Sequence, residues 1–451
     1  MANVIKIKKG LDINLKGKAL EVLMTSKNSN TYAIVPSCYV GIVPKVIAKV
    51  GDKVKAGTPL MIDKKRPEIK FVSPISGELI AVNRGEKRKI LSVVVAPDAL
   101  NEYEDFGKKK VASLSGEEVK NTILNAGMWP FIIQRPYDRI ASPEETPRDI
   151  FVSANFTAPL APNFNFVVQG EEANLQAGLT ALSKMTAGKV YVSVGANSEN
   201  IQKTDAKNIE YVQIEGPHPA GNVGVLINQV APINKGDLVW TLNATDVIII
   251  GRLFNEGKAD FTRMVAITGS ETTERGYVKA IAGCTIESLI GGRMADGSTR
   301  IISGNALTGT KVSTSDYLGA YDSQITVIPE GDDYHELFGW AVPGLDKFSV
   351  SHSYPSWMLG KKKEYTIDAR IRGGKRAMIM SNEYDSVFPM DIFPEYLIKA
   401  ILAFDIDKME SLGIYEVAPE DFALCEFVDT SKLELQHIVR QGLDLLYKEM
   451  N

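Results

Sequence analysis

Residues 215–257 read EGPHPAGNVGVLINQVAPINKGDLVWTLNATDVIIIGRLFNEG, and this stretch decides the fold. The strand-like run IEYVQIE leads into three glycines, and DVIIIGRLF is predicted as a helix that ends at Gly257. Gly216, Gly221 and Gly224 permit a loop whose N–H groups face an anion, because glycine adopts positive φ and admits a ligand close to the backbone. A loop that follows a strand also lies where open α/β sheets bind ligands.

The chemistry of this loop fits a nucleotide less well than its position does. GPHPAGNVG matches neither the dinucleotide-binding nor the P-loop pattern, no lysine follows it, and two prolines remove N–H donors. Its one titratable group, His218, is interpreted either as a hydrogen-bonded turn residue or as a base. We expect this loop to be a turn that serves packing or subunit contact rather than phosphate binding. The residues of possible ligand or subunit contact are Gly216, His218, Gly221 and Gly224.

The preceding residues predict an α/β domain. DIFVSAN at 149–155 has the pattern of a buried strand, Leu175, Leu179 and Leu182 recur at helical spacing before Gly188, and KVYVSV is a second strand. Alternation of strands and helices indicates parallel pairing.

The N-terminal third predicts a small β-sandwich. GDKVKAG followed by SPISG marks turns between short strands and resembles the biotinyl/lipoyl carrier domain. A swinging-arm carrier needs a lysine alone at the hairpin tip, whereas this chain has Arg66 there, beside Lys64 and Lys65. We therefore expect a docking module, with a carrier on Lys64 or Lys65 as the alternative.

A mixed aromatic and basic segment, MWPFIIQRPYDRI, begins the next domain after a charged linker and a capping box of Ser115 and Glu118. Aromatic rings beside an arginine can clamp a flat ring by stacking and cation–π contact. The alternative is a core strand whose arginine pairs with an acid. The candidate residues for such a clamp are Trp129, Phe131, Arg135 and Tyr137.

The remaining chain predicts two further parts. GSETTERGYVKAIAGCTIESLI resembles the soluble-ligand-binding β-grasp (SLBB) domain, which serves either as a ligand site or as an interdomain scaffold. The segment PGLDKFSVSHSYPSWMLGKKKEY is aromatic and basic, and its lysines either meet acidic headgroups or a partner, or are simply solvated. From Phe393 onward the apolar spacing predicts helices.

Composition excludes several classes of protein. The 451 residues suggest about three or four domains. A net charge of −4 disfavours nucleic acid, and no apolar run approaches the ~20 residues of a membrane span. Cys38, Cys284 and Cys425 are too dispersed for a zinc or iron–sulfur site, so we expect no metal.

Several segments, in order, resemble the A-subunit family of the Na+-translocating NADH:quinone oxidoreductase (Na+-NQR): KGLDINLKG, IFVSANFTAPLA, GPHPAGNVG, RIISGNALTG and PEDFALCEFVDTSK. The resemblance implies a multidomain α/β protein with an α/β domain related to the flavin subunit of complex I. Family members continue GPHPAGNVG with histidines, where this chain has LINQ. The expected domains are a biotinyl/lipoyl-like barrel-sandwich at 1–100, a Rossmann-like α/β domain at 101–258, an SLBB-like β-grasp domain at 259–345 and a mostly helical domain at 346–451.

The resemblance further implies a peripheral subunit on the cytoplasmic side of the bacterial inner membrane. It would contribute to quinone reduction or to assembly with the membrane subunits of the complex. The candidate quinone-binding residues are then Trp129, Phe131, Arg135 and Tyr137. Quinone is the substrate of the complex, while NADH, FAD, FMN and Fe–S belong to partner subunits; we expect no cofactor and no catalytic residue in this chain. The alternatives are an independent flavin- or nucleotide-binding oxidoreductase and a carrier-like binding module.

Overall fold

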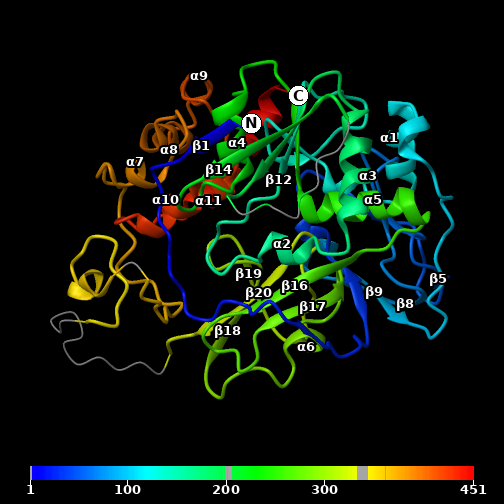
Figure 1. Ribbon diagram of the computed structural model, residues 1–451, viewed down its shortest axis with the longest axis horizontal. Coiled ribbons are helices and arrows are strands. Elements are labelled where there is room, and N and C mark those ends of the chain that lie inside the picture. The colour runs from blue at the N-terminus through cyan, green and yellow to red at the C-terminus, as the bar shows by residue number, and fades with distance from the viewer. Residues whose placement is uncertain are drawn as a thin grey trace.

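A seven-stranded sheet lies at the centre of the computed structural model, which describes residues 3–196, 198, 201, 206–332, 344–360 and 362–450 (Figure 1). The first five strands pair in parallel, and the last two are added by antiparallel pairing. In spatial order the strands are β1 (Asn3–Lys6), β14 (Ile209–Glu215), β13 (Val190–Val194), β12 (Asp149–Ser153), β15 (Val239–Asn243), β10 (Ile133–Arg135) and β11 (Arg139–Ile140).

The two faces of this sheet belong to different cores. Ile150 and Val152 of β12 pack in one hydrophobic cluster, whereas Phe151 between them packs in another. This alternation follows from the two-residue period of a strand. Because both faces are covered, every residue of the central strands β12 and β13 is buried, as in other parallel sheets.

Helices α3 (Glu172–Ser183) and α5 (Ala244–Glu256) cover the first face (Figure 1). Glycines allow their close approach: a Cβ on Gly251 would lie 1.7 Å from the carbonyl oxygen of Asn174. The helix α5 ends at Gly257 with φ of 74°, as its sequence predicted.

The second face is covered by α4 (Val223–Val230) and by the C-terminal helices. Residues 226–229, for which the sequence analysis predicted no element, lie within α4. The C-terminal helices are α7 (Glu383–Val387), α8 (Pro394–Leu402), α9 (Ile406–Ser411), α10 (Ala423–Val428) and α11 (Leu435–Met450), with the 3-10 helix η6 (Pro419–Phe422) before α10.

The barrel-sandwich consists of a four-stranded and a three-stranded sheet. The first contains β3 (Tyr32–Ile34), β9 (Ile90–Pro97), β8 (Gly77–Arg84) and β5 (Lys53–Val54), and the second contains β4 (Pro44–Val46), β6 (Pro59–Asp63) and β7 (Lys70–Val72). Short helices border it: η1 (Pro36–Cys38), η2 (Glu86–Arg88), η3 (Val111–Ser113), α1 (Gly116–Asn125) and η4 (Trp129–Phe131). The predicted capping box of Ser115 and Glu118 begins α1.

A six-stranded sheet forms the β-grasp part, with α6 (Ile286–Ile290) against it. Its order is β19 (Thr310–Val312), β18 (Thr299–Ser303), β20 (Gln324–Pro329), β16 (Thr262–Thr268), β17 (Gly276–Ile281) and β2 (Leu23–Met24). The short helix α2 (Phe164–Val167) lies beside it, since the ring of Phe166 is 4.7 Å from that of Tyr277.

The first 24 residues lie outside the barrel-sandwich. Strand β1 extends the seven-stranded sheet and β2 extends the β-grasp sheet, so the N-terminal segment connects two parts that the sequence treated as separate. At the other end, the described residues 344–382 contain one short helix, η5 (Pro355–Leu359), and are otherwise irregular. This segment forms the yellow protrusion at the left edge of Figure 1.

Candidate functional site

The Gly-rich loop is filled by the chain itself. A Cβ on Gly216 would lie 2.5 Å from the carbonyl oxygen of Ile7, and one on Gly221 would lie 2.0 Å from that of Asn155. These glycines are needed for contact with neighbouring backbone segments, which occupy the space where a ligand would approach.

His218 is a buried structural residue of this loop. Its N–H donates to Asp12 Oδ1 at 3.0 Å, its carbonyl accepts from the N–H of Leu11 at 2.8 Å, and its ring Nδ1 lies 3.1 Å from Thr157 Oγ1. Burial lowers the pKa of His218 to about 4. The imidazole is therefore neutral at physiological pH and holds the loop to the N-terminal segment.

At the start of α4 an internal carboxylate occupies the place of an external anion. A Cβ on Gly224 would lie 2.4 Å from Asp421 Oδ1 and 2.7 Å from Arg135 Nη1. Anions are favoured at helix N-termini, where N–H groups are free. The structure thus brings together two residues that the sequence assigned to separate sites, Gly224 and Arg135, through an acid from η6.

Arg135 is the centre of a buried ionic group. Its Nη1 donates to Asp421 Oδ2 at 2.9 Å and to the carbonyl oxygen of Glu416 at 2.7 Å, and its Nη2 donates to Glu420 Oε1 at 3.1 Å. Burial alone lowers the pKa of Arg135, but the charges of Asp421 and Glu420 outweigh it and raise the pKa. Arg135 therefore remains charged and joins β10 to the C-terminal helices.

The other candidate quinone residues do not share one open slot with Arg135. Trp129 is fully buried and donates its indole N–H to the carbonyl oxygen of Ala141 at 2.8 Å. Phe131 lines a cavity of only about 50 Å³ where barrel-sandwich, α/β and β-grasp parts meet. Tyr137 is half-buried, with its ring 5.2 Å from that of Tyr447.

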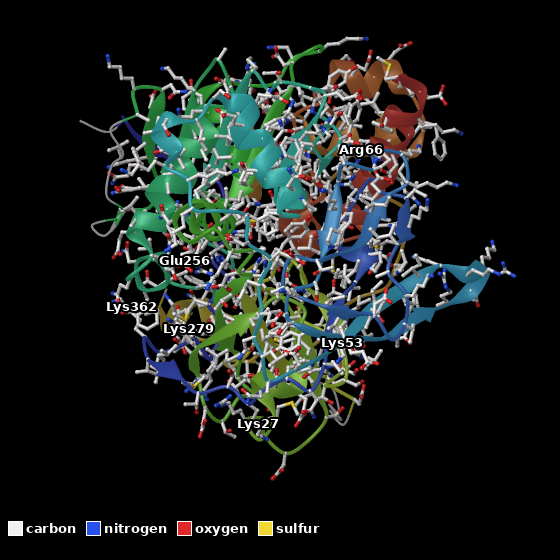
Figure 2. All side chains as sticks on the ribbon, turned by 90° about the vertical axis from the view of Figure 1, so that its right-hand side faces the viewer. Lys27, Lys53, Arg66, Glu256, Lys279 and Lys362 are labelled. Carbon is white, nitrogen blue, oxygen red and sulfur yellow. The ribbon has the colours of Figure 1, made fainter. Side chains whose placement is uncertain are left out.

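The barrel-sandwich tip is also occupied by internal contacts. Arg66 lies between β6 and β7, donates through Nε to Asp63 Oδ2 at 3.0 Å, and through Nη1 to the carbonyl oxygen of Ile140 at 3.1 Å (Figure 2). Arg66 therefore fixes the tip against the sheet that carries β11, while Lys64 and Lys65 are exposed.

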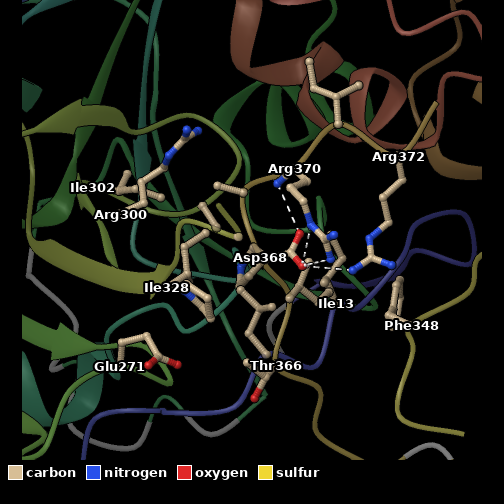
Figure 3. Close-up of a pocket in the computed structure, with 18 of the residues that line it drawn as sticks. Ile13, Glu271, Arg300, Ile302, Ile328, Phe348, Thr366, Asp368, Arg370 and Arg372 are labelled. Atoms are coloured by element: carbon tan, nitrogen blue, oxygen red, sulfur yellow. Dashed lines mark hydrogen bonds and ion pairs between the residues drawn. The ribbon is translucent and has the colours of Figure 1, made fainter. Parts of the chain in front are cut away.

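A cavity of about 770 Å³ lies between the β-grasp sheet and residues 346–372. Its volume falls within the roughly 300–1,000 Å³ of ligand pockets. Figure 3 shows residues from three of the distant segments that line it. Its lining includes Ile13 from the N-terminal segment, Glu271, Arg300, Ile302 and Ile328 from the β-grasp part, and Phe348, Thr366, Asp368, Arg370 and Arg372 from the C-terminal part.

The arginines of this cavity contact neighbouring carboxylates. Asp368 Oδ2 accepts from Arg370 Nη2 at 2.6 Å and from Arg372 Nη2 at 3.1 Å; burial raises the pKa of Asp368, but these arginines outweigh it and lower the pKa. Arg300 holds the pKa of Glu330 down at about 2 through its hydrogen bonds. The cavity thus combines apolar walls with fixed guanidinium groups. Sequence reasoning missed it because no motif marks residues contributed by three separate segments.

Neither metal-binding groups nor membrane spans occur in the described part of the chain. No cluster of three or more His, Cys, Asp or Glu side chains there has the arrangement of a metal site. No described helix combines the length and apolar character needed to cross a bilayer.

Comparison with known proteins covers nearly the whole chain. Family models described as the NqrA N-terminal barrel-sandwich hybrid domain, the NqrA second alpha/beta domain and the NQRA C-terminal domain match residues 5–98, 114–259 and 264–314. They confirm the predicted fold class. A chain of the air-oxidised NAD+-reducing [NiFe]-hydrogenase matches 41% of this chain and 41% of its own length, with a TM-score of 0.30 at 14% identity. A chain of the H2-reduced enzyme matches 49% of this chain and 50% of its own length, with a TM-score of 0.34 at 12% identity. Both TM-scores are too low to carry an argument.

Full-length relatives give the stronger result. The A subunit of the Na(+)-translocating NADH-quinone reductase of Neisseria meningitidis serogroup A is 36% identical over 449 residues, covering 99% of this chain and 100% of the relative. The protein of the same name from Yersinia pestis bv. Antiqua is 35% identical over the same span, again covering 99% of this chain and 100% of the relative. The chain therefore belongs to the A-subunit (NqrA) family of the Na+-translocating NADH-quinone reductase.

Proposed function

We propose that this chain is a peripheral subunit of a Na+-translocating NADH:quinone oxidoreductase and contributes to quinone reduction or to assembly of the complex. The observation that carries the proposal is the 36% identity to an NqrA protein along 99% of the chain. Such a length of similarity includes every domain and the connections between them.

The closed Gly-rich loop supports a role without a nucleotide of its own. The place at the start of α4 is taken by Asp421, and the loop glycines contact Ile7 and Asn155. In this proposal NADH, FAD, FMN and Fe–S are held by partner subunits, and the chain lies on the cytoplasmic side of the bacterial inner membrane. The α/β fold then serves as a rigid platform that joins the barrel-sandwich, the β-grasp part and the C-terminal helices.

Direct contact with quinone is the finer part of the proposal. A quinone needs an apolar slot with a few polar groups at its carbonyl oxygens. Tyr137 is the candidate residue with exposed surface, and Phe131 lines a small cavity nearby in sequence. The 770 Å³ cavity offers a second slot, because Ile302, Ile328 and Phe348 lie there beside Arg300 and Arg372.

The proposal is tested by isolating the complex through this chain. An affinity tag at the C-terminus, on a chain expressed at its native level, should recover further subunits from solubilised membranes together with NADH-dependent quinone reduction. Deletion of the gene should abolish this activity in membranes, and the tagged chain should restore it. Recovery of the chain alone from membranes whose activity survives the deletion would contradict the proposal.

A further inference from the structure

A convex apolar tip with a basic flank lies on η5 (Pro355–Leu359), outside every site described above. The side chains of Trp357, Met358 and Leu359 are 52%, 70% and 53% exposed, although they are consecutive and large. Single exposed apolar residues are ordinary, whereas three on one short turn form a patch that marks an interaction site.

The tip is held in this orientation by its polar neighbour. Ser356 is 1% exposed, and its Oγ donates to the carbonyl oxygen of Lys347 at 2.6 Å. Its own carbonyl accepts from the hydroxyl of Tyr365 at 3.3 Å. The serine therefore faces inward and the apolar residues outward, the reverse of the usual arrangement, and the imidazole of His352 stacks on Trp357 at 5.1 Å.

The segment that bears the tip carries positive charge. Residues 345–376 contain eight Lys and Arg against three Asp and Glu, a net charge of +5, in a chain whose net charge is −4. Lys362, three residues after Leu359, is exposed and is labelled in Figure 2. An apolar tip containing tryptophan, flanked by lysine, is suited to the interface of an anionic bilayer, where the ring lies among headgroups and the cations meet lipid phosphates.

From this arrangement we propose that Trp357, Met358 and Leu359 insert into an anionic lipid surface, with Lys362 at the headgroups. The geometry favours a lipid over a protein partner, because a stable protein interface buries about 800 Å² on each side, more than one five-residue turn presents. The contact is additional to any attachment through other subunits and does not depend on the ligand of the cavity.

Flotation of the purified full-length chain with vesicles tests the proposal. Vesicles with equal parts of phosphatidylglycerol and phosphatidylcholine should bind the chain more tightly than vesicles of phosphatidylcholine alone. The double variant Met358→Ser, Leu359→Ser should weaken binding roughly tenfold or more. Leu100→Ser is the matched control, because Leu100 is also 70% exposed but lies in the linker after the barrel-sandwich; it should leave binding unchanged.

Charge and insertion are tested separately. Lys362→Glu should weaken binding roughly fivefold or more, while Lys53→Glu, at an exposed lysine on β5 of the barrel-sandwich, should not. Bromine-labelled lipid should quench fluorescence from Trp357, and Trp357→Phe should remove the quenched fraction while the chain still floats; Trp129 and Trp240 are buried.

Failure of the wild-type chain to float, or equal flotation of the tip variants, would overturn the proposal. A second result would also overturn it: the chain does not bind vesicles, and the tip variants lose the other subunits from the detergent-solubilised complex. The tip would then be a protein interface. Unchanged thermal midpoints of the variants exclude misfolding as the cause.

Discussion

The guanidinium of Arg135 lies 2.9 Å from the carboxylate of Asp421, Nη1 to Oδ2, although the two residues are 286 positions apart in the sequence. Both side chains are 1% exposed. The pair joins strand β10 of the central sheet to the C-terminal helices and lies at the start of α4, next to Gly224. It therefore explains why position 224 requires a glycine.

Breaking this pair should strongly destabilise the protein. Arg135→Met leaves Asp421 buried without its partner, which typically costs about 3–5 kcal/mol of unfolding free energy. Urea denaturation measures the change. Lys189→Met is the matched control, since the Lys189–Glu210 pair of 2.8 Å is exposed and should contribute less than about 1 kcal/mol. Equal effects of the two substitutions would show that the buried pair has no special role.

A methyl group at Gly224 should separate the pair. Gly224→Ala places a Cβ 2.4 Å from Asp421 Oδ1, and overpacking of this kind costs about 1–3 kcal/mol, more than the helix propensity of alanine returns. Gly374→Ala, whose Cβ would meet nothing within 4 Å, should be near neutral. A Gly224→Ala protein with an unchanged or higher thermal midpoint would contradict this packing.

His218 should make stability depend on pH. Its pKa is about 4 in the folded chain and about 6.5 when unfolded, so the unfolded state binds more protons between these values. The contribution of His218 to the free energy of unfolding is fully present above about pH 6.5. It falls by roughly 3 kcal/mol as the pH drops to 4.

The measurement for His218 is the difference in unfolding free energy between wild type and His218→Gln across that range. The wild-type protein should lose more stability than the variant as pH falls. Asp246, whose pKa burial raises to about 6, acts in the opposite sense but is common to both proteins. His437→Gln, at an exposed histidine, is the control, and a difference that is constant with pH would refute the prediction.

Tyr137 is the sharper test of quinone contact. Phe131 packs against Phe261 and Tyr321, so its truncation would also disturb the core. Tyr137→Ala in the assembled complex should raise the KM for quinone up to about tenfold, with little change in its KM for NADH. Tyr396→Ala, at a residue 56% exposed on α8, is the control; an unchanged quinone KM in a folded Tyr137→Ala complex would end this prediction.

Local signals in the sequence predicted much of the central domain. The apolar run in DIFVS, the leucines of α3 and Gly257 each act over a few residues, so their patterns specify β12, α3 and the end of α5. Strand β1 and the partner of Arg135 were not predictable in this way. Their positions depend on contacts with β14 and η6, more than 200 residues away, and no local pattern records them.

We conclude that the Gly-rich loop is closed and holds no nucleotide. The sharpest test is the thermal-denaturation midpoint of the purified full-length chain, measured with NADH, FMN or FAD present. A ligand that binds only the folded state raises stability by RT ln(1 + [L]/Kd). We predict no flavin absorbance in the purified chain and no rise of the midpoint with any of the three ligands. A midpoint that rises with ligand concentration in the wild-type protein, and fails to rise in Gly221→Ala, would contradict it.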